Sequence, residues 1–94
     1  MSYEVEEKEL VAGKDEIKVK VFSPLKTYYI GIAGSVSAVN DTGAFDVLAQ
    51  HHNFITLLNA GDLTVRDKKG EHKIPIERGI MHVKKNQVTV FLGV

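Results

Sequence analysis

Apolar and polar residues alternate along most of the chain with a period of two, which is the pattern of β-strands that bury one face. The clearest case is residues 17–22, where Ile17, Val19 and Val21 are predicted to point inward and the intervening lysines to face water. Further short runs, rich in β-branched and aromatic residues, are also predicted to be strands. They cover residues 27–30, 35–39, 45–48, 54–58, 63–65, 73–77, 80–83 and 88–92.

Polar, turn-forming residues separate these runs. Pro75 predicts an edge strand or a bulge, because proline cannot donate to a central ladder. Gly31 and Gly34 predict a bulge or a close approach of the backbone. The predicted fold is all-β: a flattened β-sandwich or barrel of about eight to ten short, mostly antiparallel strands. The turns are expected at residues 40–43, 59–62, 67–70 and 84–87.

Residues 35–58 carry the longest irregular polar excursion of the pattern. After the turn at 40–43, Phe45, Val47 and Leu48 are predicted to return to the core. A loop with two adjacent histidines then precedes the apolar run at 54–58. Because binding residues often lie on loops held by a rigid scaffold, specific function is expected here or on the neighbouring rim.

Length and composition narrow the picture further. The chain has 94 residues, enough for one domain. Residues 1–15, dominated by Glu and Lys, are interpreted as a leader, and residues 16–94 as the domain. Twelve basic and twelve acidic residues cancel, which removes the electrostatic argument for nucleic-acid binding. Without cysteine there is no disulfide or thiolate metal site. No apolar run approaches a membrane span, so direct insertion is not expected.

The histidines offer little chemistry by their spacing. His51 and His52 would point to opposite sides if the chain were extended, which suits chelation poorly. His72 and His82 lie apart from them, and no HExxH motif is present. We therefore expect no metal site.

Other candidate groups also have simpler explanations. Asp41 suits a turn and Asp46 an exposed strand position, so a paired acid and base is not predicted. Ser35 and Ser37 lack the context of a nucleophile elbow. No Lys-Ser/Thr follows Gly34, so residues 31–34 are not a phosphate loop. We expect no catalytic residue, no cofactor and no small-molecule substrate.

Several short motifs nevertheless follow one another in a recognisable order. The longest is GAFDVLAQHHNFITLL at residues 43–58. Together the motifs resemble the N-terminal β-sandwich domain of the epsilon subunit of F-type ATP synthases, which is called delta in mitochondria. The others are Val-Phe-Ser-Pro at 21–24, Tyr-Ile-Gly at 29–31, Val-Ser-Ala-Val at 36–39, Gly-Asp-Leu at 61–63, Gly-Ile-Met-His-Val at 79–83 and Asn-Gln-Val-Thr-Val at 86–90.

The resemblance implies a non-catalytic subunit of the central stalk, or rotor. It would link the gamma subunit to the c ring and couple proton or sodium flow to ATP synthesis. It would lie peripherally on the cytoplasmic face of the bacterial plasma membrane. The implied gamma interface is Ser23, His51 and Thr56. The implied ring-facing loop is Asn40, Asp41, Thr42, Gly43, Ala44, Phe45 and Asp46.

Two departures from the family pattern affect these expectations. The family's Pro-Gly before its histidine is Ala49-Gln50 here, and the following Ala is His52. Loss of a preset φ and of a permissive glycine is expected to loosen or reshape this turn. The family's C-terminal pair of helices does not follow Val94, so neither nucleotide binding nor a helical brake is implied.

Two other functions stay open at this stage. The altered loop and the acidic leader are compatible with a repurposed β-sandwich interaction module unrelated to ATP synthase. The histidines alone motivate a small metal-binding or hydrolytic protein.

Overall fold

A computed structural model describes residues 10–93 of the chain. Short alternating runs form β-strands here because every second side chain can be buried while the next faces water. In the described residues the strands are β1 (Ile17–Phe22), β2 (Thr27–Ala33), β3 (Ser35–Asn40), β4 (Gly43–Leu48), β5 (Phe54–Leu58), β6 (Gly61–Asp67), β7 (Gly70–Ile76), β8 (Gly79–Lys84) and β9 (Gln87–Leu92).

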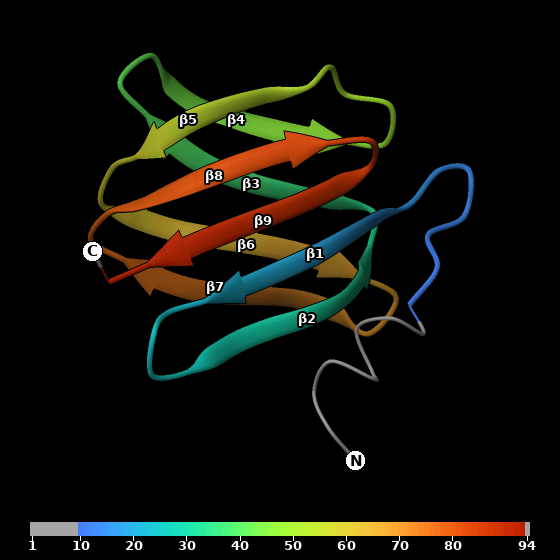
Figure 1. Cartoon of the computed structure of the whole chain (residues 1–94), viewed down its shortest axis with the longest axis horizontal. Helices are drawn as coiled ribbons and strands as arrows, with labels where there is room; N and C mark the ends of the chain where they lie inside the picture. The colour runs from blue at the N-terminus through green and yellow to red at the C-terminus, as the bar shows by residue number, and fades with distance from the viewer. Residues whose placement is uncertain (1–9, 94) are drawn as a thin grey trace.

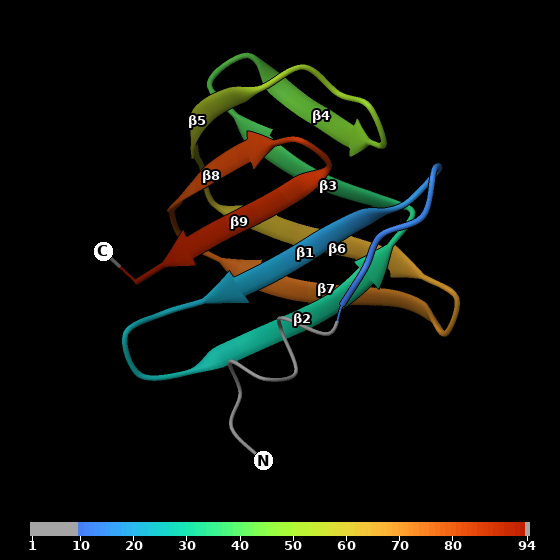
Figure 2. The same cartoon turned by 45° about the vertical axis from the view of Figure 1, so that its right-hand side comes forward.

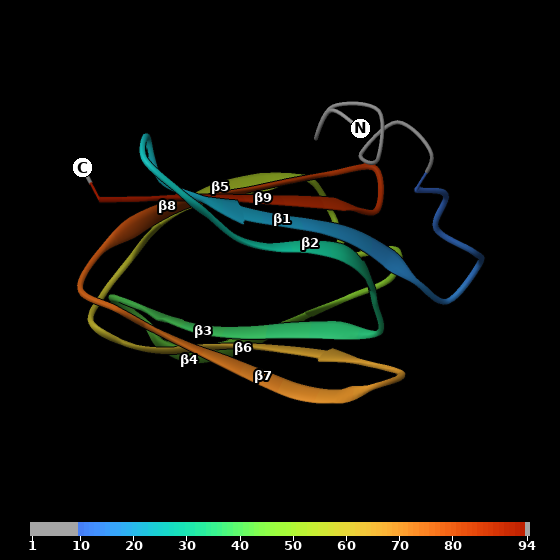
Figure 3. The ribbon, with the colours of Figure 1, turned by 90° about the horizontal axis from the view of Figure 1, so that it is seen from below.

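The strands form two sheets packed face to face, seen edge-on in Figure 3. One sheet has five strands in the order β2-β1-β9-β8-β5, and the other has four in the order β4-β3-β6-β7. Neighbouring strands are antiparallel except β1 and β9, which pair in parallel (Figure 1). The predicted all-β sandwich of short, mostly antiparallel strands is confirmed.

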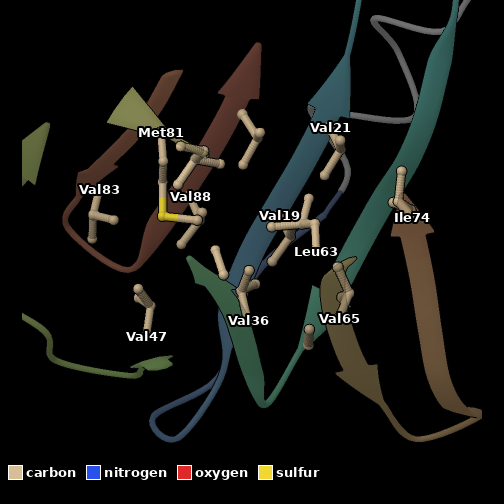
Figure 4. Packing of buried hydrophobic residues seen from close by; sticks show 14 of the residues in the cluster. Val19, Val21, Val36, Val47, Leu63, Val65, Ile74, Met81, Val83 and Val88 are labelled. Atoms are coloured by element: carbon tan, nitrogen blue, oxygen red, sulfur yellow. The ribbon is translucent and has the colours of Figure 1, made fainter. Parts of the chain in front are cut away.

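Inward side chains of both sheets fill the space between them (Figure 4). Val19 and Met81 of the five-stranded sheet and Val36 and Val65 of the four-stranded sheet have no exposed surface. Burying each such side chain stabilises the fold by about 1.5–3 kcal/mol relative to leaving it exposed. The same alternation contradicts one prediction: Val47 is buried, but the next residue, Leu48, is 54% exposed. Adjacent strand residues face opposite ways, so both could not enter the core.

Proline and glycine occupy positions that suit their chemistry. Pro75 lies in β7, an edge strand, as predicted. Gly31 does not mark a bulge; the irregular register of β1 and β2 lies between Val21 and Phe22. Instead the Tyr29 side chain lies over Gly31, where an added Cβ would come within 3.0 Å of the tyrosine hydroxyl oxygen. The missing side chain lets Tyr29 reach toward the other sheet.

The side of the sandwich between β2 and β7 is closed by a polar network. The Tyr29 hydroxyl donates to Asp67 Oδ2 at 2.8 Å, and His72 Nε2 lies 2.9 Å from the same oxygen. Asp67 Oδ1 accepts from the backbone N–H groups of Lys69 and Gly70 at 2.8 and 3.2 Å. The Tyr29 hydrogen bond, with those from His72 and Lys69, lowers the pKa of Asp67 to about 2. Burial, and then Asp67, raise the pKa of Tyr29.

The opposite side, between β4 and β5, is closed by aromatic packing. The rings of Phe45 and Phe54 meet edge to face with centroids 6.2 Å apart. Ala49 packs against the same core from the loop that follows β4. Figure 2 shows β5 and β4 together at this side, away from β2 and β7.

The predicted leader, residues 1–15, falls largely outside the described residues. From residue 10 to residue 15 the structure shows a turn at Lys14 and Asp15 and no strand. The Gly13 N–H donates to Glu16 Oε1 at 2.9 Å, just before β1 begins.

Candidate interaction surface

Ser23 follows directly after β1 and holds the turn that leads into β2. Its backbone N–H donates to the Lys26 carbonyl at 2.7 Å, and its hydroxyl lies 3.4 Å from the Leu25 N–H. The turn exposes Leu25 almost fully, at 97%. Ser23 therefore lies at the end of the five-stranded sheet where β1 and β9 finish.

His51 lies at the other end of that sheet, in the β4–β5 loop (residues 49–53). The arrangement expected of an extended chain, with His51 and His52 pointing to opposite sides, is not found, because the two rings lie close together. Their ring centroids are 4.3 Å apart, and both rings pack on Phe54, at 4.9 and 5.4 Å. The histidines form an aromatic cluster on the loop.

The predicted ring-facing residues 40–46 form the β3–β4 hairpin turn and the start of β4. Asn40 Oδ1 accepts from the Thr42 N–H at 2.9 Å, which is the side-chain turn expected of asparagine. Gly43 has a φ of 113°, a conformation that favours glycine. Ala44 and Asp46 are exposed and Phe45 points toward the core.

One hydrogen bond joins this turn to the predicted gamma-facing residue of β5. Asn40 Nδ2 donates to the Thr56 hydroxyl at 3.1 Å, and Asn59 Nδ2 donates to Asp41 Oδ1 at 2.9 Å. The β3–β4 turn and the end of β5 are thus held side by side, at one end of the sandwich. A shallow groove of about 290 Å³ lies between them, lined by Asn40, Asp41, Thr42, Ile55, Thr56 and Leu57.

Three exposed side chains beside this groove were not predicted. Ile55 and Leu57 of β5 are 68% and 67% exposed, and Ile80 of the neighbouring β8 is 37% exposed. Leu57 pairs directly with Ile80, so the three residues form one apolar patch. A second groove, of about 340 Å³, borders Leu57 and Ile80 on the side of Arg78.

The apolar patch continues inward along the outer face of the five-stranded sheet. Ile80 pairs with Phe91, and Phe91 pairs with Phe22. The two phenylalanine rings lie 5.1 Å apart. This row ends next to Ser23, so Ser23 and the patch share one end of the sheet.

The sequence carries a signal for this patch. Residues 47–61 contain no Asp, Glu, Lys or Arg, in a chain with 26% charged residues. Edge strands in soluble proteins are commonly protected by charge or proline, as β7 is by Lys73 and Pro75. The absence of charge on the edge strand β5 is the sequence signal that could have indicated a contact surface.

The outer face of the four-stranded sheet is polar by contrast. Arg66 Nε donates to Glu71 Oε2 at 3.0 Å, and its guanidinium also donates to the Ser37 hydroxyl at 2.6 Å. Ser37 in turn contacts Asp46. Asp46 is engaged here and Asp41 at the hairpin turn, so the structure does not bring the two carboxylates together.

The structure brings some of the predicted interface residues together and separates others. Asn40, Asp41, Thr42 and Thr56 meet at one groove, and Ser23 lies at the same end of the molecule. His51 lies at the opposite end, so the predicted gamma-facing residues do not form one compact patch. Within residues 10–93 no three His, Asp or Glu side chains gather as metal ligands, and no helix is long and apolar enough to cross a membrane.

These features define a class: a small β-sandwich whose uncharged edge strand and apolar patch suit packing against another protein. The sequence profile described as ATP synthase, delta/epsilon chain, beta-sandwich domain, matches residues 16–93. The chain belongs to this family.

Individual relatives agree with the family match. The chain is 32% identical to the ATP synthase epsilon chain of Sulfurimonas denitrificans over 78 residues, which cover 82% of this chain and 60% of the relative. It is 31% identical to the chloroplastic ATP synthase epsilon chain of Tetradesmus obliquus, covering 79% of this chain and 54% of that one. The chain thus spans somewhat over half the length of these relatives.

The fold is also similar to that of a solved structure. A chain of the mitochondrial ATP synthase of Euglena gracilis, solved as an assembly of OSCP, F1 and c-ring, superposes with a TM-score of 0.77 at 18% identity. The match covers 89% of this chain and 54% of that one.

Proposed function

We propose that this chain is a central-stalk subunit of an F-type ATP synthase, which links the gamma subunit to the c ring. The observation that carries the proposal is the family match over residues 16–93. On this proposal residues 16–94 form the sandwich domain and residues 1–15 a leader. The subunit acts without covalent chemistry, by coupling proton or sodium flow mechanically to ATP synthesis.

The exposed apolar patch supports a large protein partner. Ile55 and Leu57 of β5 and Ile80 of β8 are exposed on the outer face of the five-stranded sheet, and burying them would remove apolar surface from water. We assign this patch, with Ser23 and Thr56 beside it, to the gamma subunit. His51 is assigned to a separate contact with gamma at the far end of the sheet.

The β3–β4 turn suits the second partner. Asp41, Thr42, Ala44 and Asp46 are exposed, and the turn projects from one end of the sandwich (Figure 1). We assign residues 40–46 to the contact with the c ring. The complex then holds the subunit at the membrane peripherally, on the cytoplasmic face of the bacterial plasma membrane.

A pair of exposed apolar residues tests the gamma contact. Leu57 lies on β5 within the patch, and Val11 precedes β1, outside every proposed contact; they are 67% and 81% exposed. We expect Leu57→Glu to weaken binding to purified gamma about 30-fold, the effect of losing a central contact residue. Val11→Glu should change it by less than about threefold. Equal effects would contradict the assignment, and a wild-type chain that does not bind gamma would favour an unrelated interaction module.

Single cysteines test the ring contact, because the chain has none of its own. Thr42→Cys, at the β3–β4 turn, should form cross-links with the c subunit in assembled complexes. Lys69→Cys, at the β6–β7 turn on the opposite end of the sandwich, should not. Cross-linking from Lys69→Cys alone would reverse the proposed orientation.

A further inference from the structure

The β4–β5 loop begins with a turn that normally needs glycine. The His51 N–H donates to the Leu48 carbonyl at 3.3 Å, so residues 48–51 close a four-residue turn. Gln50, its third residue, has a φ of 68°, whereas Ala49 has no positive φ. This combination is that of a type II turn, in which glycine is preferred at the third position and proline at the second. The Ala49-Gln50 pair thus adopts a backbone conformation that a Pro-Gly pair would also favour.

A residue with a side chain keeps such a conformation only when its surroundings hold it. Here the β8–β9 turn (residues 84–87) stabilises the left-handed conformation of Gln50. The Gln50 N–H donates to Asn86 Oδ1 at 2.6 Å, and the Lys85 N–H donates to Asn53 Oδ1 at 3.0 Å. Two hydrogen bonds, one donated by each segment to an asparagine side chain of the other, thus tie the β4–β5 loop to a turn more than thirty residues away in the sequence.

Asn86 is itself rigidly placed. Lys85 and Asn86 have φ values of 48° and 59°, as the two-residue type I′ hairpin turn requires. The Asn86 carbonyl also accepts from the Lys18 N–H of β1 at 2.9 Å. Asparagine tolerates the left-handed conformation and offers a side-chain oxygen, so one residue can form the turn and hold the loop.

We propose that Asn86 is the positioning residue of the β4–β5 loop, fixing Gln50 in its left-handed conformation and thereby presenting the His51–His52 rings on Phe54. In a Pro-Gly turn the two residues themselves favour this backbone conformation. In the Ala49-Gln50 turn the hydrogen bond from the Gln50 N–H to Asn86 Oδ1 holds it instead. The part of this inference that concerns gamma rests on the proposed function, since His51 is a proposed gamma contact. The part that concerns the loop does not.

Two substitutions separate the side-chain bond from the turn backbone. Asn86→Gly keeps the left-handed backbone but removes the acceptor for Gln50. Asn86→Asp keeps an acceptor oxygen in the same place and also tolerates the left-handed region. We expect Asn86→Gly to speed hydrogen exchange of the Gln50 amide about tenfold, as loss of one hydrogen bond implies. The Lys18 amide, whose acceptor is the retained backbone carbonyl, should be unchanged, and Asn86→Asp should restore protection of Gln50.

The reciprocal bond provides a second measurement. Asn53→Ala should speed exchange of the Lys85 amide and leave the β1 amides unaffected. If Gln50 exchanges at the wild-type rate in Asn86→Gly, the positioning role is wrong. The same conclusion follows if Asn86→Asp fails to restore the protection.

Binding to purified gamma then distinguishes this inference from the proposed function. A wild-type chain that does not bind gamma overturns the proposed function, while the exchange rates still decide the role of Asn86. If the wild type binds, Asn86→Gly should bind more weakly and Asn86→Asp as well as wild type. Wild-type affinity in an Asn86→Gly chain that has lost Gln50 protection would overturn the link between loop geometry and partner binding.

Discussion

The two open sides of the sandwich are closed by opposite kinds of contact. Between β2 and β7, Tyr29, Asp67 and His72 form directional bonds around one carboxylate. Between β4 and β5, the rings of Phe45 and Phe54 pack edge to face, and the stretch around Phe54, residues 47–61, contains no Asp, Glu, Lys or Arg. Each side joins the same two sheets, yet only the aromatic side borders the apolar patch.

This difference indicates that one side of the sandwich only joins the two sheets, whereas the other side can also contact a partner. In the polar network both oxygens of Asp67 already accept hydrogen bonds, from Tyr29, His72 and two backbone N–H groups, so the carboxylate is used within the fold. On the aromatic side, β5 carries Phe54 inside and exposes Ile55 and Leu57, and this apolar surface can pack against a neighbouring protein. The polar side therefore serves stability, and the aromatic side serves both stability and the proposed contact.

The largest expected effect comes from opening the aromatic side. Phe54→Ala removes the ring that packs on Phe45 and supports His51, and should lower the free energy of unfolding by about 3 kcal/mol. Urea unfolding would measure it, with Leu48→Ala, at an exposed position, as the control. If Phe54→Ala costs no more than that control, the rings do not close this side.

Opening the polar side should cost somewhat less. Asp67→Ala leaves the Tyr29 hydroxyl and two backbone N–H groups without their acceptor, which is expected to cost about 2 kcal/mol. Tyr29→Phe removes only one of these bonds and should cost about 1 kcal/mol. A Tyr29→Phe loss larger than that of Asp67→Ala would contradict the central position of the carboxylate.

The polar side should also be the acid-sensitive one. The pKa of Asp67 is about 2 in the folded chain, below its ordinary value of 3.8, so the folded state binds fewer protons between these values. The stability that Asp67 contributes is thus present above about pH 4 and lost as the pH falls through 2. The difference in unfolding free energy between wild type and Asp67→Asn should narrow from pH 5 to pH 2. A constant difference would show that Asp67 does not titrate with folding.

The smallest effect concerns the turn that leads into the aromatic side. Ala49→Pro with Gln50→Gly supplies the residues that a type II turn prefers, and should raise the free energy of unfolding by up to about 1 kcal/mol. Thermal unfolding would measure the gain, with Gln50→Gly alone separating the glycine contribution. A lowered melting temperature in the double variant would show that the turn does not accept proline.

Sequence reasoning succeeded where the deciding forces are local. All nine predicted strands are present in the described residues, because period-two alternation and turn chemistry depend on neighbours in the chain. The failure at Leu48 came from ignoring that period, since Val47 had already taken the inward position. The predicted orientation of His51 and His52 failed because it assumed an extended chain in a segment that is a loop.

The candidate surface was only half predictable. Residues 40–42 and Thr56 were named from the resemblance, and the structure brings them to one groove. Ile55, Leu57 and Ile80 were missed because a strand residue can face core or solvent, and the face depends on the partner sheet. Only the register of β5 with β8 puts Leu57 beside Ile80 on the outside.

The amino-acid sequence by itself determined the strands, the turns and the all-β class, because burial alternation and backbone preference act within a few residues. Tertiary structure alone decided which distant groups meet. Tyr29 reaches Asp67 across 38 positions and Gln50 reaches Asn86 across 36. Such contacts depend on how the two sheets and their connecting loops pack. The number of residues between two positions in the sequence does not determine how far apart they lie in the fold.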